Sequence, residues 1–373
     1  MKIGLGLYRH MLTPDYFSFA RQAGCTDIVV HLTDYFRGET PDVRNNQPIG
    51  SKYKAWGYAG DPNALWTATE LHSLKQRLEE AGLRFAAIEN LDPAFWYDIL
   101  LDGPKRALQI ENVKTILRRM GEVGIPVLGY NFSLGGVCGR VTSPNGRGGA
   151  MIVGMDGAAD EEPIPNGMVW NMIYDRDAAP GILPSTTHEQ LWGRLERFLH
   201  EVVPIAEKAG VRLAAHPDDP PMPTMRQQPR LVYQPHMYQR LIDLVPSRSN
   251  ALELCVGTLA EMTEGNIYDA VDQYSKQEKI AYIHLRNVIG KVPHYRETFI
   301  DEGDVDMIRV LAILHRNHFD GVLIPDHTPQ MTCSAPWHAG MAHTLGFMLA
   351  AKAFIESSRH QPNNLESIIR GGN

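Results

Sequence analysis

AEKAGVRLAAHPDDPP, residues 206–221, contains the unit from which the fold can be inferred. An amphipathic segment ends at Gly210, an apolar run of strand length follows, and polar residues begin at His216. A glycine at a helix C-terminus supplies the left-handed turn that returns the chain to a sheet. The same arrangement recurs in RQAGCTDIVV (21–30), LEEAGLRFAAI (78–88) and MGEVGIPVLGY (120–130). The stretch therefore indicates a repeated helix–glycine–strand unit.

Strand-length apolar runs alternate with helix-length amphipathic segments along the whole chain, as in parallel sheets. We expect strands at residues 3–7, 27–32, 84–89, 125–131, 211–216, 250–256, 280–286 and 321–326. Eight such units favour an α/β fold of the (β/α)8 barrel (TIM-barrel) type over a flavodoxin-like sheet with an appended domain. No boundary divides the chain, so we expect one domain over residues 1–373.

Two stretches, residues 33–65 and 132–188, interrupt this rhythm after the second and fourth strands. In a barrel, both insertions would lie over the catalytic face, because the loops that follow strands gather at that end. The second is rich in glycine and proline and has little periodicity. Loops of this length are lids, binding loops or disordered segments, and we favour a lid or an oligomer contact.

The composition is that of an ordinary globular protein, with 373 residues of which 43% are hydrophobic and 21% charged. A net charge of -7 argues against nucleic-acid binding. No apolar run reaches membrane-spanning length, and the N-terminal run is too short for a signal peptide. The four cysteines are widely spaced, so we expect reduced thiols in the cytoplasm. A homo-oligomer is also expected.

Four residues that can bind a metal end four consecutive predicted strands, and these are His216, Cys255, His284 and Asp326. On neighbouring barrel strands they would converge at the C-terminal mouth, where such barrels keep their active sites. Imidazole, thiolate and carboxylate together suit a divalent ion such as Mn, Fe, Co or Zn. Taken singly, Cys255 fits a packing role equally well, since a free cysteine behaves as a small hydrophobe.

Polar residues beside these positions are candidates for substrate binding. The HPDDPP string places Asp218 and Asp219 in a stiff loop, although aspartates in such loops also cap backbone amides. Arg286 and Asn287 leave the strand that carries His284, and an arginine fork can bind a carboxylate. The alternative for this pair is a capped strand end with an ion pair. Two further strand-end residues, Asn131 and His31, complete the predicted substrate-binding set.

His327 directly follows Asp326, and side chains alternate along a strand, so both can face the mouth only if the strand ends there. An imidazole in that place can serve as a general acid or base. A supporting hydrogen bond is its alternative role.

Several long strings, in order, resemble the mannonate dehydratase family of metal-dependent TIM barrels, which is xylose-isomerase-like. In the second half these are HPDDPP (216–221), LCVGTLAEM (254–262), IHLRNV (283–288), HYRETFIDEGDVDM (294–307) and FDGVLIPDH (319–327). In the first half these are ARQAGCTDIVVHL (20–32), FAAIENLDP (85–93) and ENVKTILRRMGEVGIPVLGYNF (111–132). The likeness runs over most of the chain and is weakest in residues 132–188.

The resemblance implies a hydro-lyase of carbohydrate metabolism that holds Mn²⁺, or alternatively Fe²⁺ or Co²⁺, at His216, Cys255, His284 and Asp326. It implies dehydration of D-mannonate to a 2-keto-3-deoxy sugar acid through an enediolate, with His327 carrying a proton. Such an intermediate is stabilised by a cation at the substrate carboxylate and 2-hydroxyl.

The sequence departs from the family after the Asp-His pair. Family members carry a Gly-Tyr pair and then a Gly-Arg pair there, whereas this chain reads SAPWHAGMAHTLGF (334–347). Pro336 or Trp337 falls at the tyrosine position and Met341 at the arginine. We therefore consider His338 as a substitute catalytic group. The departure leaves open a sugar isomerase, an epimerase or an eliminase of another substrate, and a catalytically reduced sugar-acid-binding protein.

Overall fold

Eight parallel strands close into a barrel whose neighbours follow the order of the chain. The structure is a computed structural model and describes residues 1–38, 56–157, 162–357 and 368–370. The barrel strands are β1 (Lys2–Leu7), β2 (Asp27–Val30), β4 (Arg84–Glu89), β5 (Val127–Tyr130), β10 (Arg212–Ala215), β13 (Asn250–Cys255), β14 (Ile280–Leu285) and β17 (Val322–Pro325). They are the eight strands predicted from the sequence, and the (β/α)8 expectation is confirmed.

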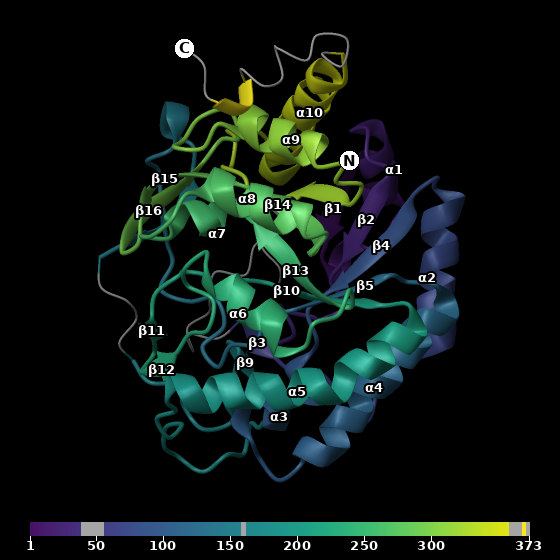
Figure 1. Cartoon of the computed structure of the whole chain (residues 1–373), viewed down its shortest axis with the longest axis vertical. Helices are drawn as coiled ribbons and strands as arrows, with labels where there is room; N and C mark the ends of the chain where they lie inside the picture. The colour runs from purple at the N-terminus through teal and green to yellow at the C-terminus, as the bar shows by residue number, and fades with distance from the viewer. Residues whose placement is uncertain (39–55, 158–161, 358–367, 371–373) are drawn as a thin grey trace.

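Helices surround the barrel on its outside (Figure 1). They are α1 (Pro14–Gln22), α2 (Ala68–Glu80), α3 (Tyr97–Leu101), α4 (Arg106–Val123), α5 (His188–Ala209), α6 (Met237–Leu244), α7 (Val256–Glu261), α8 (Ile267–Lys276), α9 (Met307–Arg316) and α10 (Pro336–Ser357). The longest ones begin and end on clear signals. A capping box of Thr187 and Gln190 starts α5. Gly210 ends it in the left-handed conformation, at a φ of 67°, as the sequence predicts.

Two apolar layers hold the barrel together. The larger lies between the strands and the helices, and includes residues such as Leu128, Leu213 and Leu254. The smaller fills the barrel interior, where Ala214 and Ala251 leave room for the ring of Tyr282. Side chains alternate along a strand, so residues two positions further along these strands also face the interior, nearer the mouth. This register decides which side chains meet in the site.

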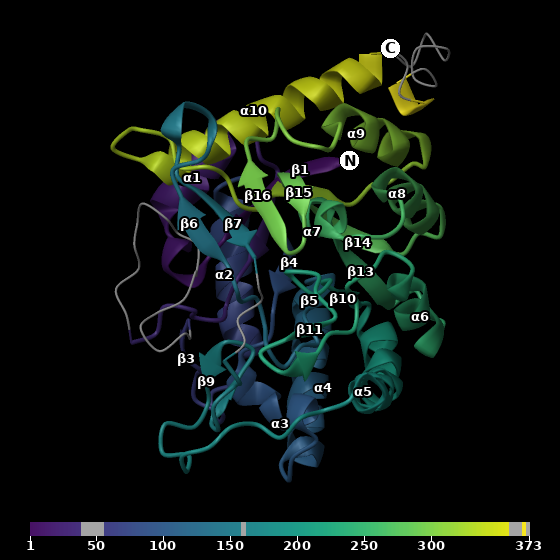
Figure 2. The same ribbon diagram turned by 90° about the vertical axis from the view of Figure 1, so that its left-hand side faces the viewer.

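The second insertion pairs with a hairpin that follows β14. Strands β6 (Val141–Ser143) and β7 (Ile152–Asp156) join β16 (His294–Thr298) and β15 (Asn287–Lys291) in one antiparallel sheet. Figure 2 shows these four strands together at one side of the barrel. A second small sheet joins the two insertions through β3 (Gly57–Tyr58), β9 (Met172–Ile173) and β8 (Met168–Val169). The short pair β11 (Thr224–Met225) and β12 (Gln228–Pro229) follows β10.

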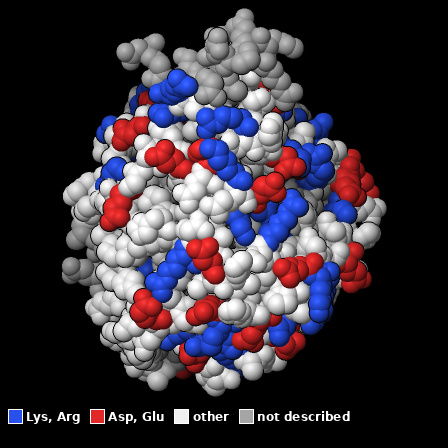
Figure 3. Space-filling model, in the orientation of Figure 1, with Lys and Arg blue, Asp and Glu red and all other residues white. Residues whose placement is uncertain are grey.

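The part of the first insertion between residues 39 and 55 lies outside the described residues. Of the described helices, none combines the length and the apolar character needed to cross a membrane. On the face shown in Figure 3, basic and acidic side chains are intermixed rather than gathered into one patch.

Candidate metal centre and active site

A cavity opens at the carboxyl ends of the barrel strands and encloses about 1010 Å³ of empty space, its open mouth included. Strand-end residues line its floor, and side chains from both insertions line its walls, namely Tyr35 and Trp56 from the first and Val137, Arg140 and Trp170 from the second. The insertions therefore contribute directly to the cavity.

The four predicted metal ligands converge beneath this cavity: His216, His284 and Asp326 line it, and Cys255 is buried directly beside them. Ligand atoms of His216, Cys255 and His284 all lie within 4.8 Å of one another. The Asp326 carboxylate joins them, with Oδ1 3.7 Å from His284 Nδ1 and Oδ2 3.8 Å from Cys255 Sγ. His284 Nδ1 is buried and has no hydrogen-bond partner. A buried polar atom without a partner is costly, and a cation at this point would satisfy it.

The charges around this group prepare it for a cation. Burial raises the pKa of the Cys255 thiol, but the positive charge of Arg286 and the neighbouring imidazoles of His216 and His284 outweigh it and lower that pKa to about 6. Burial also opposes ionisation of Asp326, yet the neighbouring His327, His284 and Arg286 hold its pKa well below the ordinary value. Thiolate and carboxylate are thus both anionic at neutral pH, which is the state that binds metals.

The opposite nitrogen of His284 faces two buried glutamates. His284 Nε2 lies 3.1 Å from Glu89 Oε2 and 3.0 Å from Glu253 Oε1. This contact fixes the proton on Nε2 and directs Nδ1 toward Cys255 and Asp326. Their pKa values shift in opposite directions. Burial raises the pKa of Glu253, reinforced by Glu89, whereas His31 and His284 overcome burial and lower the pKa of Glu89 to about 2.

The sequence interpretation missed these glutamates because each lies inside an apolar strand. The signal that could have found them is the two-residue period of a strand. Glu253 lies two residues before Cys255 and two after the interior residue Ala251, and so must face the barrel axis.

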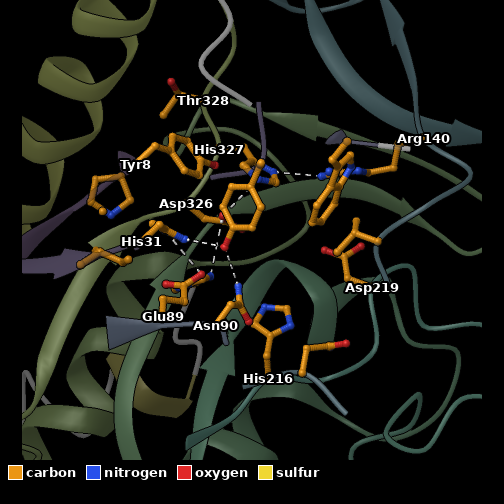
Figure 4. Close-up of a pocket in the computed structure, with 18 of the residues that line it drawn as sticks. Tyr8, His31, Glu89, Asn90, Arg140, His216, Asp219, Asp326, His327 and Thr328 are labelled. Carbon is orange, nitrogen blue, oxygen red and sulfur yellow. Dashed lines mark hydrogen bonds and ion pairs between the residues drawn. The ribbon is translucent and has the colours of Figure 1, made fainter. Parts of the chain in front are cut away.

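His327 lines the cavity and is held from one side by charged groups. Its Nδ1 is 3.0 Å from Glu297 Oε1 and 3.3 Å from Arg286 Nη1. The same nitrogen is 3.5 Å from Arg140 Nη1, a contact drawn in Figure 4. Its Nε2 lies 3.3 Å from Asp326 Oδ1. Glu297 and Arg140, which sequence reasoning also missed, come from β16 and from the second insertion.

Arg286 is an internal counter-ion and is absent from the cavity lining. Its guanidinium lies 2.9 Å from Asp219, 3.0 Å from both Glu261 and Glu297, and 3.3 Å from Asp326. The prediction that it binds substrate is corrected, since the side chain is 1% exposed, lies outside the cavity lining, and has both terminal nitrogens held by carboxylates. Asp219 does line the cavity, and its buried Oδ1 has no hydrogen-bond partner, which leaves that oxygen available to a ligand.

Two other predicted substrate-binding residues serve the backbone instead. Asp218 accepts hydrogen bonds from the amides of Leu231 and Val232, which is the capping role considered for the HPDDPP loop. Asn287 donates to the carbonyl oxygens of Ile300 and Val305. Both are buried, and neither belongs to the cavity lining. Their hydrogen-bonding capacity is used in holding loops.

Asn131 and His31 do line the cavity, but their side chains have internal partners. The Asn131 amide donates to the carbonyl oxygen of Pro217 and accepts from the Trp170 indole, at 3.0 and 3.1 Å. His31 Nδ1 lies 3.0 Å from the hydroxyl of Tyr35. Asn131 therefore ties the second insertion to the His216 loop.

His338 lies outside the cavity, which corrects the prediction that it is a catalytic residue. Its ring packs on Tyr16 and Phe19 of α1, with ring centres 5.4 and 4.7 Å away. The neighbouring Trp337 and Met341 face the cavity instead, because residues three and four apart share a helix face. The start of α10 thus gives the cavity an indole and a thioether, neither of which is ionisable.

Fold and site together define a class, that of (β/α)8-barrel enzymes with a metal-competent centre at the carboxyl ends of the strands. The family model described as D-mannonate dehydratase (UxuA) matches residues 17–346. The chain belongs to this family of hydro-lyases and is an enzyme of that kind. The resemblance found in the sequence is confirmed.

Individual relatives agree with this assignment. The mannonate dehydratase of Streptococcus pneumoniae (strain 70585) is 31% identical over 277 residues, covering 70% of this chain and 74% of its own. That of Lactococcus lactis subsp. cremoris (strain MG1363) is 29% identical over 290 residues, covering 70% and 78%. The crystal structure of mannonate dehydratase from Streptococcus suis serotype 2 has a TM-score of 0.74 at 24% identity, over 96% of this chain and 95% of that one. An L-ribulose 3-epimerase shares the fold at a TM-score of 0.54 and 14% identity, over 97% and 99%.

Proposed function

We propose that this enzyme dehydrates D-mannonate, or a closely related sugar acid, to a 2-keto-3-deoxy acid by way of an enediolate. The observation that carries the proposal is the convergence of His216, Cys255, His284 and Asp326 at the base of one cavity, three of them in its lining, in a member of the D-mannonate dehydratase family. Sugar acids carry a carboxylate and vicinal hydroxyls, which a centre of this kind can bind together.

We further propose Mn²⁺ as the ion, with Fe²⁺ or Co²⁺ as alternatives. Two nitrogens, a thiolate and a carboxylate fit a divalent transition ion, and the unpartnered Nδ1 of His284 supports a ligand at this point. When bound, the ion supplies positive charge for the substrate carboxylate and for the negative charge that develops when the C2 proton leaves.

The surrounding side chains have distinct roles in this proposal. His327, fixed by Glu297, carries a proton to or from the substrate. Asp219 offers its free oxygen to a substrate hydroxyl, and Arg140 lines the cavity as a cation that can face the substrate carboxylate. The aromatic side chains from the two insertions narrow the cavity and limit water. We propose that both insertions act as a lid over this face of a single domain.

A direct assay tests the proposal. Metal-replete protein is incubated with D-mannonate, and formation of a 2-keto-3-deoxy acid is followed, together with deuterium incorporation at C2 in D₂O. Product formation supports dehydration. Deuterium exchange without product would refute it and would favour an isomerase or epimerase, because these share the C2 proton transfer but expel no water. Binding without exchange would favour a sugar-acid-binding protein.

A ligand variant tests the metal centre separately. His216→Ala removes one ligand, and we expect it to lose stoichiometric Mn²⁺ binding in calorimetry. His338→Ala, matched in residue type but outside the cavity, should bind one equivalent as the parent does. Unchanged Mn²⁺ binding by His216→Ala would contradict the proposed centre.

We also infer a reducing, cytoplasmic setting, which is supported by all four cysteines being free. The homo-oligomer expected from the sequence stays a prediction.

A further inference from the structure

Dehydration needs two proton transfers, one from C2 and one to the departing hydroxyl at C3. His327 can serve one of them. The other ionisable side chains in the cavity wall are largely engaged. The hydroxyl of Tyr35 contacts His31 and accepts from Asn90, and Glu89 contacts His284. The start of α10 contributes no ionisable group to the cavity.

Tyr8 differs from these residues. It directly follows β1, and its ring and hydroxyl face the cavity (Figure 4). Strand β1 pairs with β17 so that Ile3 lies opposite Leu323. The two strands are therefore neighbours, and the residues that follow them, Tyr8 and His327, both line the cavity. Within the described part of the chain, the hydroxyl of Tyr8 has no hydrogen-bond partner, whereas its ring is firmly held.

Four aromatic contacts fix that ring, the first a stack with His10 at 6.2 Å between ring centres. It tilts over His31 with ring centres 4.6 Å apart, and meets Tyr35 and Phe36 edge-on at 5.7 and 6.1 Å. Such contacts hold an aromatic ring in a defined orientation. The ring is thus held in one orientation, while its hydroxyl makes no hydrogen bond to the described residues and faces the cavity.

We propose that Tyr8 is the general acid that protonates the departing hydroxyl. This inference rests on the proposed function. His327 takes the C2 proton, and the electron pair of the C2–H bond delocalises into the carboxylate as the enediolate. That pair then forms the C2–C3 double bond, and the C3–O bond breaks as the hydroxyl takes the proton of Tyr8 and leaves as water. The enol then tautomerises to the 2-keto acid, and the Tyr8 phenolate regains a proton from solvent through the open mouth.

Electrostatics support a donor rather than a base. Burial, reinforced by the negative charges of Asp326 and Glu89, raises the pKa of Tyr8. The hydroxyl therefore keeps its proton at neutral pH until a reaction step demands it.

The test compares Tyr8→Phe with the parent on D-mannonate and on its 3-deoxy-3-fluoro analogue. Fluoride leaves with much less need of a proton than hydroxide. The phenylalanine keeps the ring contacts, so we expect KM within about threefold and kcat on mannonate about 100-fold lower or more. Exchange of the C2 proton should persist, and the reduction in kcat on the fluoro analogue should be only a few-fold.

Tyr130→Phe is the matched control. Tyr130 is buried on β5, its hydroxyl has no partner, and it packs against Phe198 of α5 rather than in the cavity. We expect parent kinetics from it. A Tyr8→Phe enzyme that dehydrates mannonate at the parent rate, or whose kcat falls equally on both substrates, would overturn the role of Tyr8. It would leave the proposed function intact. A parent enzyme that dehydrates neither substrate would overturn the proposed function and this role with it.

Discussion

Replacing Arg286 with glutamine should abolish the low pKa of the Cys255 thiol. The guanidinium is the largest favourable influence on that thiolate, with the neighbouring imidazoles of His216 and His284 next. A pKa of about 6 leaves about 90% of the thiol ionised at pH 7. Without the cation, burial and the remaining carboxylates should bring the pKa to 9 or above, and the thiolate at pH 7 to about 1% or less.

The assay is a pH titration of thiolate absorbance near 240 nm in metal-free protein. Cys255→Ser, titrated in parallel, removes the signal of the other three cysteines by difference. Arg286→Lys is the second control, since it keeps the charge and should keep most of the low pKa. Breaking buried ion pairs costs about 3–5 kcal/mol, so circular dichroism must show that Arg286→Gln is folded under the assay conditions.

The outcome is decisive for the electrostatic account of the centre. A Cys255 step that stays near pH 6 in folded Arg286→Gln would refute the argument that Arg286 prepares the thiolate. A parent protein that shows no Cys255 ionisation step below pH 8 would refute the same argument.

Two further predictions concern stability and the correction at α10. Hydrogen bonds from Asn317, Lys276 and Arg316 outweigh burial and lower the pKa of Asp272 to about 2, below the unfolded value of about 3.9. A depressed carboxyl pKa stabilises the fold above the unfolded pKa and loses that effect as the pH falls toward the folded value. After allowance for solvent screening, Asp272→Asn should lower the free energy of unfolding by about 1 kcal/mol at pH 6. Urea unfolding should show this difference between variant and parent narrowing between pH 5 and pH 3. A difference in unfolding free energy that widens on acidification would contradict the stabilising role of the Asp272 carboxylate. His338→Ala should keep kcat/KM within about twofold while losing about 1 kcal/mol of stability from its contacts with Tyr16 and Phe19. A 100-fold loss of kcat would restore His338 as a catalytic candidate.

The barrel could be predicted from the sequence because each strand is a largely apolar run and four of them directly follow a helix that ends at a glycine. The predicted ends differ from the observed ones by no more than two residues, as for residues 125–131 against Val127–Tyr130. Parallel strands buried on both faces have this continuous pattern, and chain order then fixes which strands are neighbours.

The site was predictable only in part. Strand ends identify where side chains gather, which was sufficient to bring His216, Cys255, His284 and Asp326 together. Sequence position does not show whether a polar group is already used by the backbone, which is why Asp218 and Asn287 were assigned to substrate binding. Nor does it show the reach of a long insertion, and so Arg140 escaped notice.

The most direct test of the account is the position of the metal. A crystal of the protein soaked with Mn²⁺ should show one anomalous scattering peak with bonds of about 2.0–2.4 Å to His216, Cys255, His284 and Asp326. A peak bound instead between Glu89 and Glu253, or no peak in this cavity at saturating Mn²⁺, would contradict the central claim.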